Sequence, residues 1–239
     1  MKLALISGGS KGLGAEIAKK YLARGFQVLE FSRSAPHSYS VAADFSDPRQ
    51  AAAVMARELS VLAPLSFEEI VVVSNAGTVS PIGPASRKEP AEVAGNLNVN
   101  VTSAILFISE AIRQFQNQPC KKTIVNISSG AALMPFFGWS LYCSAKACLE
   151  TFVRTLSLEQ VAEPHPFLAI SIEPGIIDTD MQASIRTSSE RDFPDLRRFL
   201  GFQQSGALRP ADEVAEIVLK IVQRNSGNGL RYNVQDVRP

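Results

Sequence analysis

Three residues in the middle of the chain have the types and spacing needed for proton chemistry at a carbonyl group. Ser129 lies thirteen positions before Tyr142, and Lys146 follows Tyr142 by four. Residues four apart on a helix share a face, so the Lys146 ammonium can lie beneath the Tyr142 ring. A neighbouring cation favours the phenolate and lowers the phenol pKa from its ordinary value of about 10. Tyr142 is therefore a candidate acid or base, and Ser129 is a candidate to hold the substrate oxygen.

The same spacing also fits an ordinary surface pair on a helix, with Ser128, Ser129 and Gly130 forming a loop at the end of a strand. Short motifs recur by chance in many proteins, so the spacing alone favours this plain interpretation. The catalytic interpretation depends on what else the chain contains.

A glycine-rich turn follows the first apolar run, residues 3–7, and leads into a helical pattern that ends at Gly25. Gly8 permits the tight turn, Gly12 lets the backbone approach a pyrophosphate, and Gly14 allows the helix to pack on the sheet. The N–H groups at the start of such a helix bind anions. The predicted apolar stripe of the helix consists of Leu13, Ile17, Ala18, Tyr21 and Leu22. This strand, turn and helix predict a dinucleotide-binding unit.

The residues after the second apolar run, residues 27–31, indicate which dinucleotide is preferred. In a dinucleotide-binding fold this strand ends beside the adenosine ribose, where Asp or Glu bonds a 2′-hydroxyl and Arg accepts a 2′-phosphate. Ser32 and Arg33 stand at this point, and Glu30 is the competing carboxylate inside the strand. Arg33, together with Lys11 in the glycine turn, predicts the phosphorylated cofactor, NADP.

Apolar strand-like runs alternate with helical patterns along all 239 residues, without an internal repeat. We expect strands at residues 3–7, 27–31, 41–44, 69–74, 123–127, 167–172 and 230–234. We expect helices from the glycine turn to Gly25, from a cap at Asp47 to about residue 63, at about 92–116, at about 142–162, and from Pro210 onward. The predicted fold is α/β, a single-domain doubly wound parallel sheet (Rossmann fold) over residues 1–239 with helices on both faces. Residues 176–209 lack a clear strand, which suits a lid or substrate loop.

Composition narrows the classes of partner and site. The formal net charge of +1 argues against nucleic acid and anionic membrane as partners. The first residues run directly into the glycine turn and no apolar run reaches membrane-spanning length, so we expect a cytoplasmic protein. Cys120, Cys143 and Cys148 lack metal-site spacing and are expected to be reduced thiols. His37 and His165 each neighbour a proline and are far apart in sequence, so we expect neither a metal site nor a histidine-based triad.

The joint pattern resembles the short-chain dehydrogenase/reductase family, in its short single-domain form, over nearly the whole chain. The residues that carry the resemblance are Ser7, Gly8, Gly12, Gly14, Asp44, Asn75-Ala76-Gly77, Asn100, Ser129, Tyr142, Lys146, Pro174-Gly175 and Thr179. The resemblance implies that Tyr142 protonates the carbonyl oxygen, that Lys146 lowers its pKa and bonds the nicotinamide ribose, and that Ser129 orients the substrate. It further implies that Asn100 holds a water linking Lys146 to solvent, with Asn98 as the rival for this role.

The resemblance also implies a set of cofactor contacts. Asp44 is expected at the adenine edge, and Ile177 and Thr179 at the carboxamide. The full expected set is Gly8, Ser10, Lys11, Gly12, Leu13, Gly14, Ser32, Arg33, Asp44, Phe45, Asn75, Ala76, Gly77, Tyr142, Lys146, Pro174, Gly175, Ile177 and Thr179.

Within the family, residues 75–78 and 178–182 are similar to the sepiapterin reductase and bacterial benzil reductase branch. Sepiapterin reductases end with an acidic residue that anchors the pterin, and Asp236 is the one carboxylate near the matching region here. This departure favours an NADPH-dependent reductase of aromatic or vicinal diketones, with sepiapterin reduction as the alternative. A non-catalytic NADP-binding sensor and an NAD-dependent alcohol dehydrogenase are further alternatives. A sensor would have no need of the proton-transfer residues, and Arg33 with Lys11 disfavours NAD.

Aromatic and sulfur-containing side chains cluster around the predicted reacting groups. They are Met134, Phe136, Phe137 and Trp139 between Ser129 and Tyr142, and Met181, Phe193, Phe199 and Phe202 in the lid. They predict an apolar pocket for a flat carbonyl substrate, with Ser129, Phe136, Trp139, Tyr142 and Met181 as substrate contacts.

The two longest predicted helices, 92–116 and 142–162, resemble the pair through which family members assemble. The resemblance implies a homodimer or homotetramer, and the candidate interface residues are Phe107 and Leu158.

Overall fold

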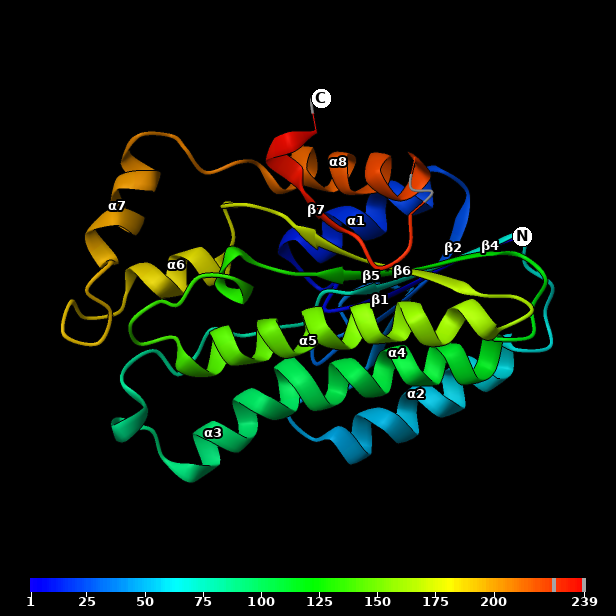
Figure 1. The fold of residues 1–239 in the computed structure, drawn as a ribbon, viewed down its shortest axis with the longest axis horizontal. Coiled ribbons are helices and arrows are strands. Elements are labelled where there is room, and N and C mark those ends of the chain that lie inside the picture. The colour runs from blue at the N-terminus through cyan, green and yellow to red at the C-terminus, as the bar shows by residue number, and fades with distance from the viewer. Residues whose placement is uncertain (225–226, 238–239) are drawn as a thin grey trace.

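The computed structural model, which describes residues 1–224 and 227–237, is built on a seven-stranded parallel sheet (Figure 1). The strands are β1 (Lys2–Ser7), β2 (Phe26–Ser32), β3 (Ser40–Ala42), β4 (Glu69–Ser74), β5 (Lys121–Ile127), β6 (Phe167–Glu173) and β7 (Arg231–Asn233). Their order is β3-β2-β1-β4-β5-β6-β7, and every neighbouring pair is parallel. The predicted doubly wound sheet is confirmed, with each predicted strand present to within three residues at either end.

Helices cover both faces of this sheet (Figure 1). One face packs against α1 (Gly12–Ala23) and α8 (Ala211–Arg224), and the other against α2 (Pro48–Leu62), α4 (Ser103–Phe115) and α5 (Ser140–Glu159). Successive strand residues point to opposite faces. Ala4 and Ile6 therefore join the core under α1 and α8, whereas Leu3 and Leu5 join the core under α2 and α4. This division explains why the strands read as continuous apolar runs in the sequence.

Two apolar residues lie elsewhere than predicted. Leu22 was expected on the buried stripe of α1, but its side chain is 40% exposed, whereas Tyr21 beside it is buried. Phe107 was expected at a subunit interface, but it is fully buried and packs edge-on against Phe31 at 5.9 Å between ring centroids. Phe107 belongs to the core and is not available to a second copy of the chain. Leu158 is 74% exposed, so its predicted place at an interface remains open to test.

The predicted helix at 92–116 is interrupted. It consists of α3 (Pro90–Leu97), a π-helical turn (Asn98–Thr102) and α4. Single π-helical turns inside α-helices are frequent at functional sites, because the extra residue redirects side chains. Asn100, a predicted site residue, stands in the middle of this turn. The second long helix, predicted at 142–162, is α5 followed by a 3₁₀ turn at Gln160–Ala162.

Residues 176–209 contain two short helices, α6 (Asp180–Arg186) and α7 (Leu196–Gln204). In Figure 1 they lie together at one end of the molecule, beyond the carboxyl ends of the strands. They enclose an apolar cluster around Trp139, whose ring stacks on Phe193 at 4.9 Å and meets Phe199 edge-on at 5.4 Å. Several of the predicted lid aromatics thus hold these helices against the body of the protein. Opening and closing of this segment stays a prediction.

Close packing of α1 on the sheet depends on a residue without a side chain. A Cβ atom on Gly14 would lie 2.3 Å from the carbonyl oxygen of Gly8 and 2.5 Å from Nδ2 of Asn75. We expect Gly14→Ala to displace α1 and to cost about 1–3 kcal/mol of unfolding free energy. For a chain of this size, that is a fall in Tm of about 2–4 °C per kcal/mol, measurable by thermal unfolding.

Gly95→Ala is the matched control, because Gly95 is also helical and a Cβ there would meet nothing within 4 Å. We expect this variant to keep the original Tm or to gain up to about 1 kcal/mol. Equal Tm values for the two variants would show that α1 does not need close contact with the glycine turn.

Candidate active site

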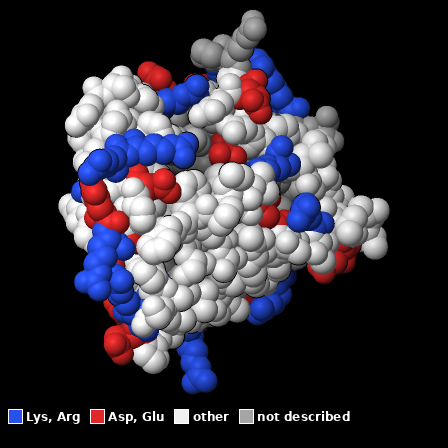
Figure 2. Space-filling model, turned by 60° about the vertical axis from the view of Figure 1, so that its left-hand side comes forward, with Lys and Arg blue, Asp and Glu red and all other residues white. Residues whose placement is uncertain are grey.

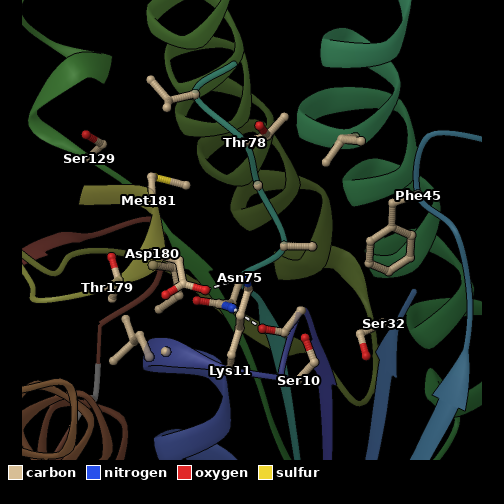
Figure 3. Close-up of a pocket in the computed structure, with 18 of the residues that line it drawn as sticks. Ser10, Lys11, Ser32, Phe45, Asn75, Thr78, Ser129, Thr179, Asp180 and Met181 are labelled. Atoms are coloured by element: carbon tan, nitrogen blue, oxygen red, sulfur yellow. Dashed lines mark hydrogen bonds and ion pairs between the residues drawn. The ribbon is translucent and has the colours of Figure 1, made fainter. Parts of the chain in front are cut away.

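The carboxyl ends of the parallel strands meet at one edge of the sheet, and a cavity of about 590 Å³ opens there (Figure 3). It lies across β1 and β4, where the strand order reverses direction and open α/β sheets bind ligands. The predicted cofactor residues all line it, except Gly14, which packs behind the turn. Thr78, Val79, Ser80 and Ser184 also line it and were not predicted. Thr78, Val79 and Ser80 directly follow the predicted Asn75-Ala76-Gly77 segment. Their position just past the end of β4 is the sequence feature that could have identified them as cavity residues.

The glycine turn is tied to the end of β4. Gly8 has φ +71°, and a Cβ there would lie 2.7 Å from Cα of Ala76. Asn75 donates from Nδ2 to the carbonyl of Gly8 at 2.8 Å, and Ser7 Oγ accepts from the N–H groups of Asn75 and Ala76. Gly12, with φ +57°, opens α1 beside the cavity. The turn therefore offers bare backbone and a helix N-terminus to an anionic group.

Glu30 and Arg33 differ in burial and in their contact with the cavity. Glu30 is fully buried and accepts hydrogen bonds from the N–H of Gly9 at 2.8 Å and from the hydroxyl of Ser32 at 3.1 Å. Its carboxylate holds the glycine turn and does not line the cavity. Arg33 is exposed and lines the cavity together with Asp44. Hydrogen bonds from Ser46 lower the pKa of Asp44, and the Arg33 guanidinium acts in the same direction.

Lys11 contacts the lid. Its ammonium lies 2.5 Å from Oδ2 of Asp180 at the start of α6, and both side chains are exposed. Figure 3 shows the two side chains meeting beside the cavity between the glycine turn and α6. The predicted contact of Lys11 with a 2′-phosphate competes with this ion pair. Exposed ion pairs contribute about 0–1 kcal/mol, so a bound phosphate can displace Asp180.

Three of the four predicted catalytic residues, Ser129, Tyr142 and Lys146, line the cavity together, and Asn100 does not line it. Ser129 follows β5 and begins the 3₁₀ turn Gly130–Ala132, where its Oγ accepts from the N–H of Ala131 at 3.1 Å. Tyr142 is buried on α5, and the Ser129 side chain acts on it to lower its pKa. Lys146 donates from Nζ to the carbonyl of Ile127 at 2.7 Å and lies 5.6 Å from the centroid of the Tyr142 ring. The structure thus brings Ser129, at the end of β5, next to the helical pair of Tyr142 and Lys146.

The pKa of Tyr142 is shifted upward, opposite to the direction expected from the neighbouring Lys146. Burial raises the pKa of Tyr142 to about 12, and the Ser129 side chain offsets only part of that change. Burial likewise lowers the pKa of Lys146 to about 8, against the opposing effect of Glu150. The cause is desolvation, which disfavours the charged form of either group and outweighs their proximity. A phenol held in this way is protonated near neutral pH, so it is suited to donate a proton rather than to accept one.

Asn100 lies near Lys146, whereas Asn98, its rival for the water-holding role, does not. Asn100 is buried, and its amide donates to the carbonyl of Thr78 and accepts from the N–H of Thr78, both at 2.8 Å. A Cβ on Gly77 would lie 3.2 Å from Oδ1 of Asn100 and 3.9 Å from Nζ of Lys146, so these two groups flank the same space. Asn98 points away and donates to the carbonyl of Ser46. The water-holding role of Asn100 stays a prediction.

The predicted substrate contacts divide into two groups. Ser129, Tyr142 and Met181 line the cavity. Phe136 and Trp139 lie outside its lining and pack in the aromatic cluster, where Trp139 meets the Tyr142 ring edge-on at 5.7 Å. Trp139 thus packs against the Tyr142 ring in this structure. Direct contact of either residue with a substrate stays a prediction.

Comparison with known proteins adds independent findings. The family model described as short chain dehydrogenase matches residues 2–190, a range that includes the glycine turn, Ser129, Tyr142 and Lys146. A benzil reductase ((S)-benzoin forming) of Bacillus subtilis is 36% identical over 241 residues, or 99% of this chain and 99% of the relative. A sepiapterin reductase of Meriones unguiculatus is 34% identical over 167 residues, or 68% of this chain and 62% of the relative. The crystal structure of the KRED1-Pglu enzyme has a TM-score of 0.82 at 28% identity, covering 97% of this chain and 100% of that one.

The two asparagines of the π-helical turn make a direct test of the site geometry. We expect Asn100→Ala to lower the unfolding free energy by about 1–3 kcal/mol, because the N–H of Thr78 loses its partner and the carbonyl of Thr78 and Oδ1 of Asn96 each lose a donor. Asn98→Ala removes one exposed hydrogen bond, and we expect a change within about 0.5 kcal/mol. Thermal or urea unfolding of both variants measures the difference. The reverse order of stability would assign the structural role to Asn98.

Proposed function

Because the chain belongs to the short-chain dehydrogenase family, we propose that it is an NADPH-dependent carbonyl reductase acting on one carbonyl of an aromatic or vicinal diketone. The observation that carries the proposal is the convergence of Ser129, Tyr142 and Lys146 in one cavity, with the phenol held in its protonated form. The B. subtilis relative, a benzil reductase by name, supports the substrate class.

The cavity fits a dinucleotide. Its inner end offers the bare backbone of Gly8 and Gly12 at the start of α1, and its outer end offers Arg33 beside Asp44. We expect Arg33 to bind the 2′-phosphate, the glycine turn to bind the pyrophosphate, and Ile177 and Thr179 to contact the nicotinamide amide. NADPH bound there would supply the hydride.

The residues of the chain then divide the remaining work. The hydroxyl groups of Ser129 and Tyr142, which line the same cavity, hold the carbonyl oxygen. As the oxygen gains negative charge, Tyr142 gives up its proton to it. The Lys146 ammonium beneath the ring then stabilises the phenolate. The carbonyl of Ile127 fixes the position of that ammonium.

The substrate end of the cavity favours an apolar ligand. Val79, Ile127 and Met181 line it near the reacting groups. Among the described residues, the carboxylates in the lining are Asp44, at the adenosine end, and Asp180, paired with Lys11. Figure 2 shows one face of the molecule with a broad area free of Lys, Arg, Asp and Glu in its lower middle, and with charged side chains along the left margin of this area and above it.

Sepiapterin reduction is the second candidate, favoured by the 34% identity to the M. unguiculatus enzyme. A pterin would need an acidic anchor, and the expected candidate, Asp236, is exposed and does not line the cavity. The complete proton-transfer set speaks against a non-catalytic NADP sensor. Arg33 and Lys11, which both line the cavity, speak against an oxidative alcohol dehydrogenase that uses NAD.

Other expectations accompany this proposal. We expect residues 1–239 to act as one domain, residues 176–209 to serve as a lid, and the chain to assemble as a homodimer or homotetramer in the cytoplasm. No described helix is long and apolar enough to cross a membrane.

The substrate class is tested by following NADPH oxidation with benzil, 1-phenyl-1,2-propanedione and sepiapterin, with chiral analysis of the products. We expect the aromatic diketones to give the highest kcat/KM and benzil to give (S)-benzoin, as the name of the B. subtilis relative states for that enzyme. A kcat/KM for sepiapterin above that of every diketone would reverse the ranking.

Tyr142→Phe is the control for this assay, because it removes the proposed proton donor and keeps the packing of the ring. Its kcat should fall by about 10² or more while its Tm stays close to that of the unmodified protein. More than about a tenth of the original kcat would contradict the role of Tyr142.

Cofactor choice depends on Arg33. Charge-assisted hydrogen bonds to a phosphate contribute about 1.5–3 kcal/mol, or about tenfold to a hundredfold in affinity. We expect NADPH to exceed NADH in kcat/KM by that factor, and Arg33→Ala to remove most of the difference. Steady-state kinetics with both cofactors measures it, and equal use of NADH and NADPH by the unmodified protein would refute the assignment.

The pH dependence of reduction follows from Lys146. Its pKa of about 8 means that the ammonium is present below this pH and lost above it, while Tyr142 stays protonated throughout. At saturating diketone, kcat/KM for NADPH reports groups of the free enzyme. We expect it to be level between about pH 6 and 7.5 and to fall above about pH 8. A rate of reduction that rises steadily across pH 8 would exclude this role for the ammonium.

A further inference from the structure

A guanidinium from the last strand lies directly behind the catalytic residues. Arg231 of β7 donates from Nη2 to the carbonyl of Ser129 at 3.1 Å and to Oε2 of Glu173 at 2.6 Å. Its Nη1 donates to Oγ of Ser128 at 3.0 Å and also contacts Oε1 of Glu150. One side chain thus binds the end of β5, the end of β6 and the middle of α5.

The two carboxylates of this cluster, Glu150 and Glu173, bind two different nitrogens of the same guanidinium group. Two nitrogens of the planar guanidinium each meet one carboxylate, a geometry that a lysine cannot reproduce. Glu150 is buried, and Glu173 and Arg231 are each 21% exposed. Within residues 1–224 and 227–237, no other Lys or Arg forms an ion pair with either carboxylate. A carboxylate that is largely shielded from water is destabilised unless a cation pairs with it, so the charged forms of Glu150 and Glu173 depend on Arg231.

The cluster also adjoins the catalytic lysine. Glu150 follows Lys146 by four positions on α5, a spacing at which opposite charges attract across one helical turn. Lys146 nevertheless bonds the carbonyl of Ile127, while Oε1 of Glu150 is held by Ser128 and Arg231. Arg231 therefore supplies the cation that Glu150 would otherwise find in Lys146.

We propose that Arg231 is a positioning residue for the catalytic set, which fixes Ser129 through its backbone carbonyl and keeps Glu150 from drawing Lys146 away from Tyr142. The effect on turnover rests on the proposed reductase function. Glu173 extends the same contact to the turn at Pro174 and Gly175, which lines the cofactor cavity. Arg231 itself does not line the cavity and acts through its neighbours.

The decisive experiment compares Arg231→Met with Arg231→Met/Glu150→Gln. Loss of Arg231 leaves Glu150 uncompensated beside Lys146, so we expect kcat to fall by about tenfold or more, with a smaller change in KM for the diketone. The double variant removes one positive and one negative charge together. It should recover a large part of the lost kcat, because Lys146 again has no competing carboxylate. Arg231→Lys keeps the charge without the bidentate geometry and should lie between the unmodified protein and Arg231→Met.

The pH profile separates positioning from a purely structural role. The titratable groups that act on Lys146 directly are Tyr142 and Glu150 on α5. Arg231 from β7 contacts Glu150 and also binds Glu173 from β6, and the π-helical turn contributes the uncharged Asn100. We expect Arg231→Met to move the alkaline limb of kcat/KM to higher pH, Glu150→Gln to move it to lower pH, and the double variant to return it toward its original position.

A binding measurement keeps this test independent of the substrate assignment. Trp139 is the one tryptophan in the sequence and touches the Tyr142 ring, so its fluorescence can report NADPH binding across the pH range. The midpoint at which NADPH affinity falls should shift in the same directions as the kinetic limb. If no carbonyl compound is reduced, the proposed function fails while these shifts still decide the role of Arg231. Glu150→Gln provides the same readout if Arg231→Met does not fold.

Arg24→Met is the matched control, because Arg24 also binds a carboxylate, Glu216, but at the far end of α1. It should change neither kcat nor the pH midpoint. The proposal is overturned if Arg231→Met keeps the original kcat and midpoint. It is equally overturned if the Arg231 variants lose only Tm, as Arg24→Met would, or if Glu150→Gln leaves the midpoint unmoved.

Discussion

Parallel pairing of the strands is the constraint on which every other feature of this protein depends. The register aligns Ser7 with Ser74, Ser74 with Asn126, and Asn126 with Ser171, so β1, β4, β5 and β6 end within two residues of the same level. The glycine turn, the Asn75 segment, Ser129 and Pro174 all leave the sheet at that edge. A slip of one residue would turn each strand over and exchange its two buried faces. The strand register that packs apolar side chains into both cores therefore also brings these segments to the same edge of the sheet.

Burial at that edge determines the chemistry as much as the identity of the side chains does. Tyr142 and Lys146 are both enclosed, and loss of water moves each pKa toward the neutral form. Hydrogen bonds to backbone carbonyls and an equal number of positive and negative formal charges offset the unfavourable free energy of burying charge at this site. Lys146 and Arg231 carry two positive charges, and Glu150 and Glu173 carry two negative ones. Removing one member of such a group leaves its partners uncompensated, which is why the cluster couples catalytic groups to residues outside the cavity.

The outer side of the cavity is held by weaker forces. The contact of Lys11 with Asp180 is exposed and contributes little, whereas the stacked rings of Trp139 and Phe193 bury apolar surface. The segment carrying α6 and α7 is thus anchored mainly by its aromatic side chains. The polar contact between the glycine turn and α6 can exchange with a ligand. This arrangement allows the cavity to admit an anionic cofactor without loss of the packed cluster behind it.

Local patterns in the sequence were sufficient for the strands, the helix cap at Asp47, the glycine turn and the spacing of Tyr142 and Lys146. Each of these is set by neighbours within a few positions, where periodicity and backbone preference act directly. The structure alone decided the burial of Phe107 and the exposure of Leu22, because several faces compete for apolar side chains once the layers pack.

Only the tertiary structure showed the direction of the Tyr142 and Lys146 pKa shifts, since desolvation depends on everything that surrounds a group. It also placed Glu30 under the glycine turn and brought Arg231 to the carbonyl of Ser129, 102 positions away. Spacing along the chain carries no information about such a contact. The sequence by itself therefore determined which groups can react, and the packing of distant strands decided what holds them, shields them and balances their charge.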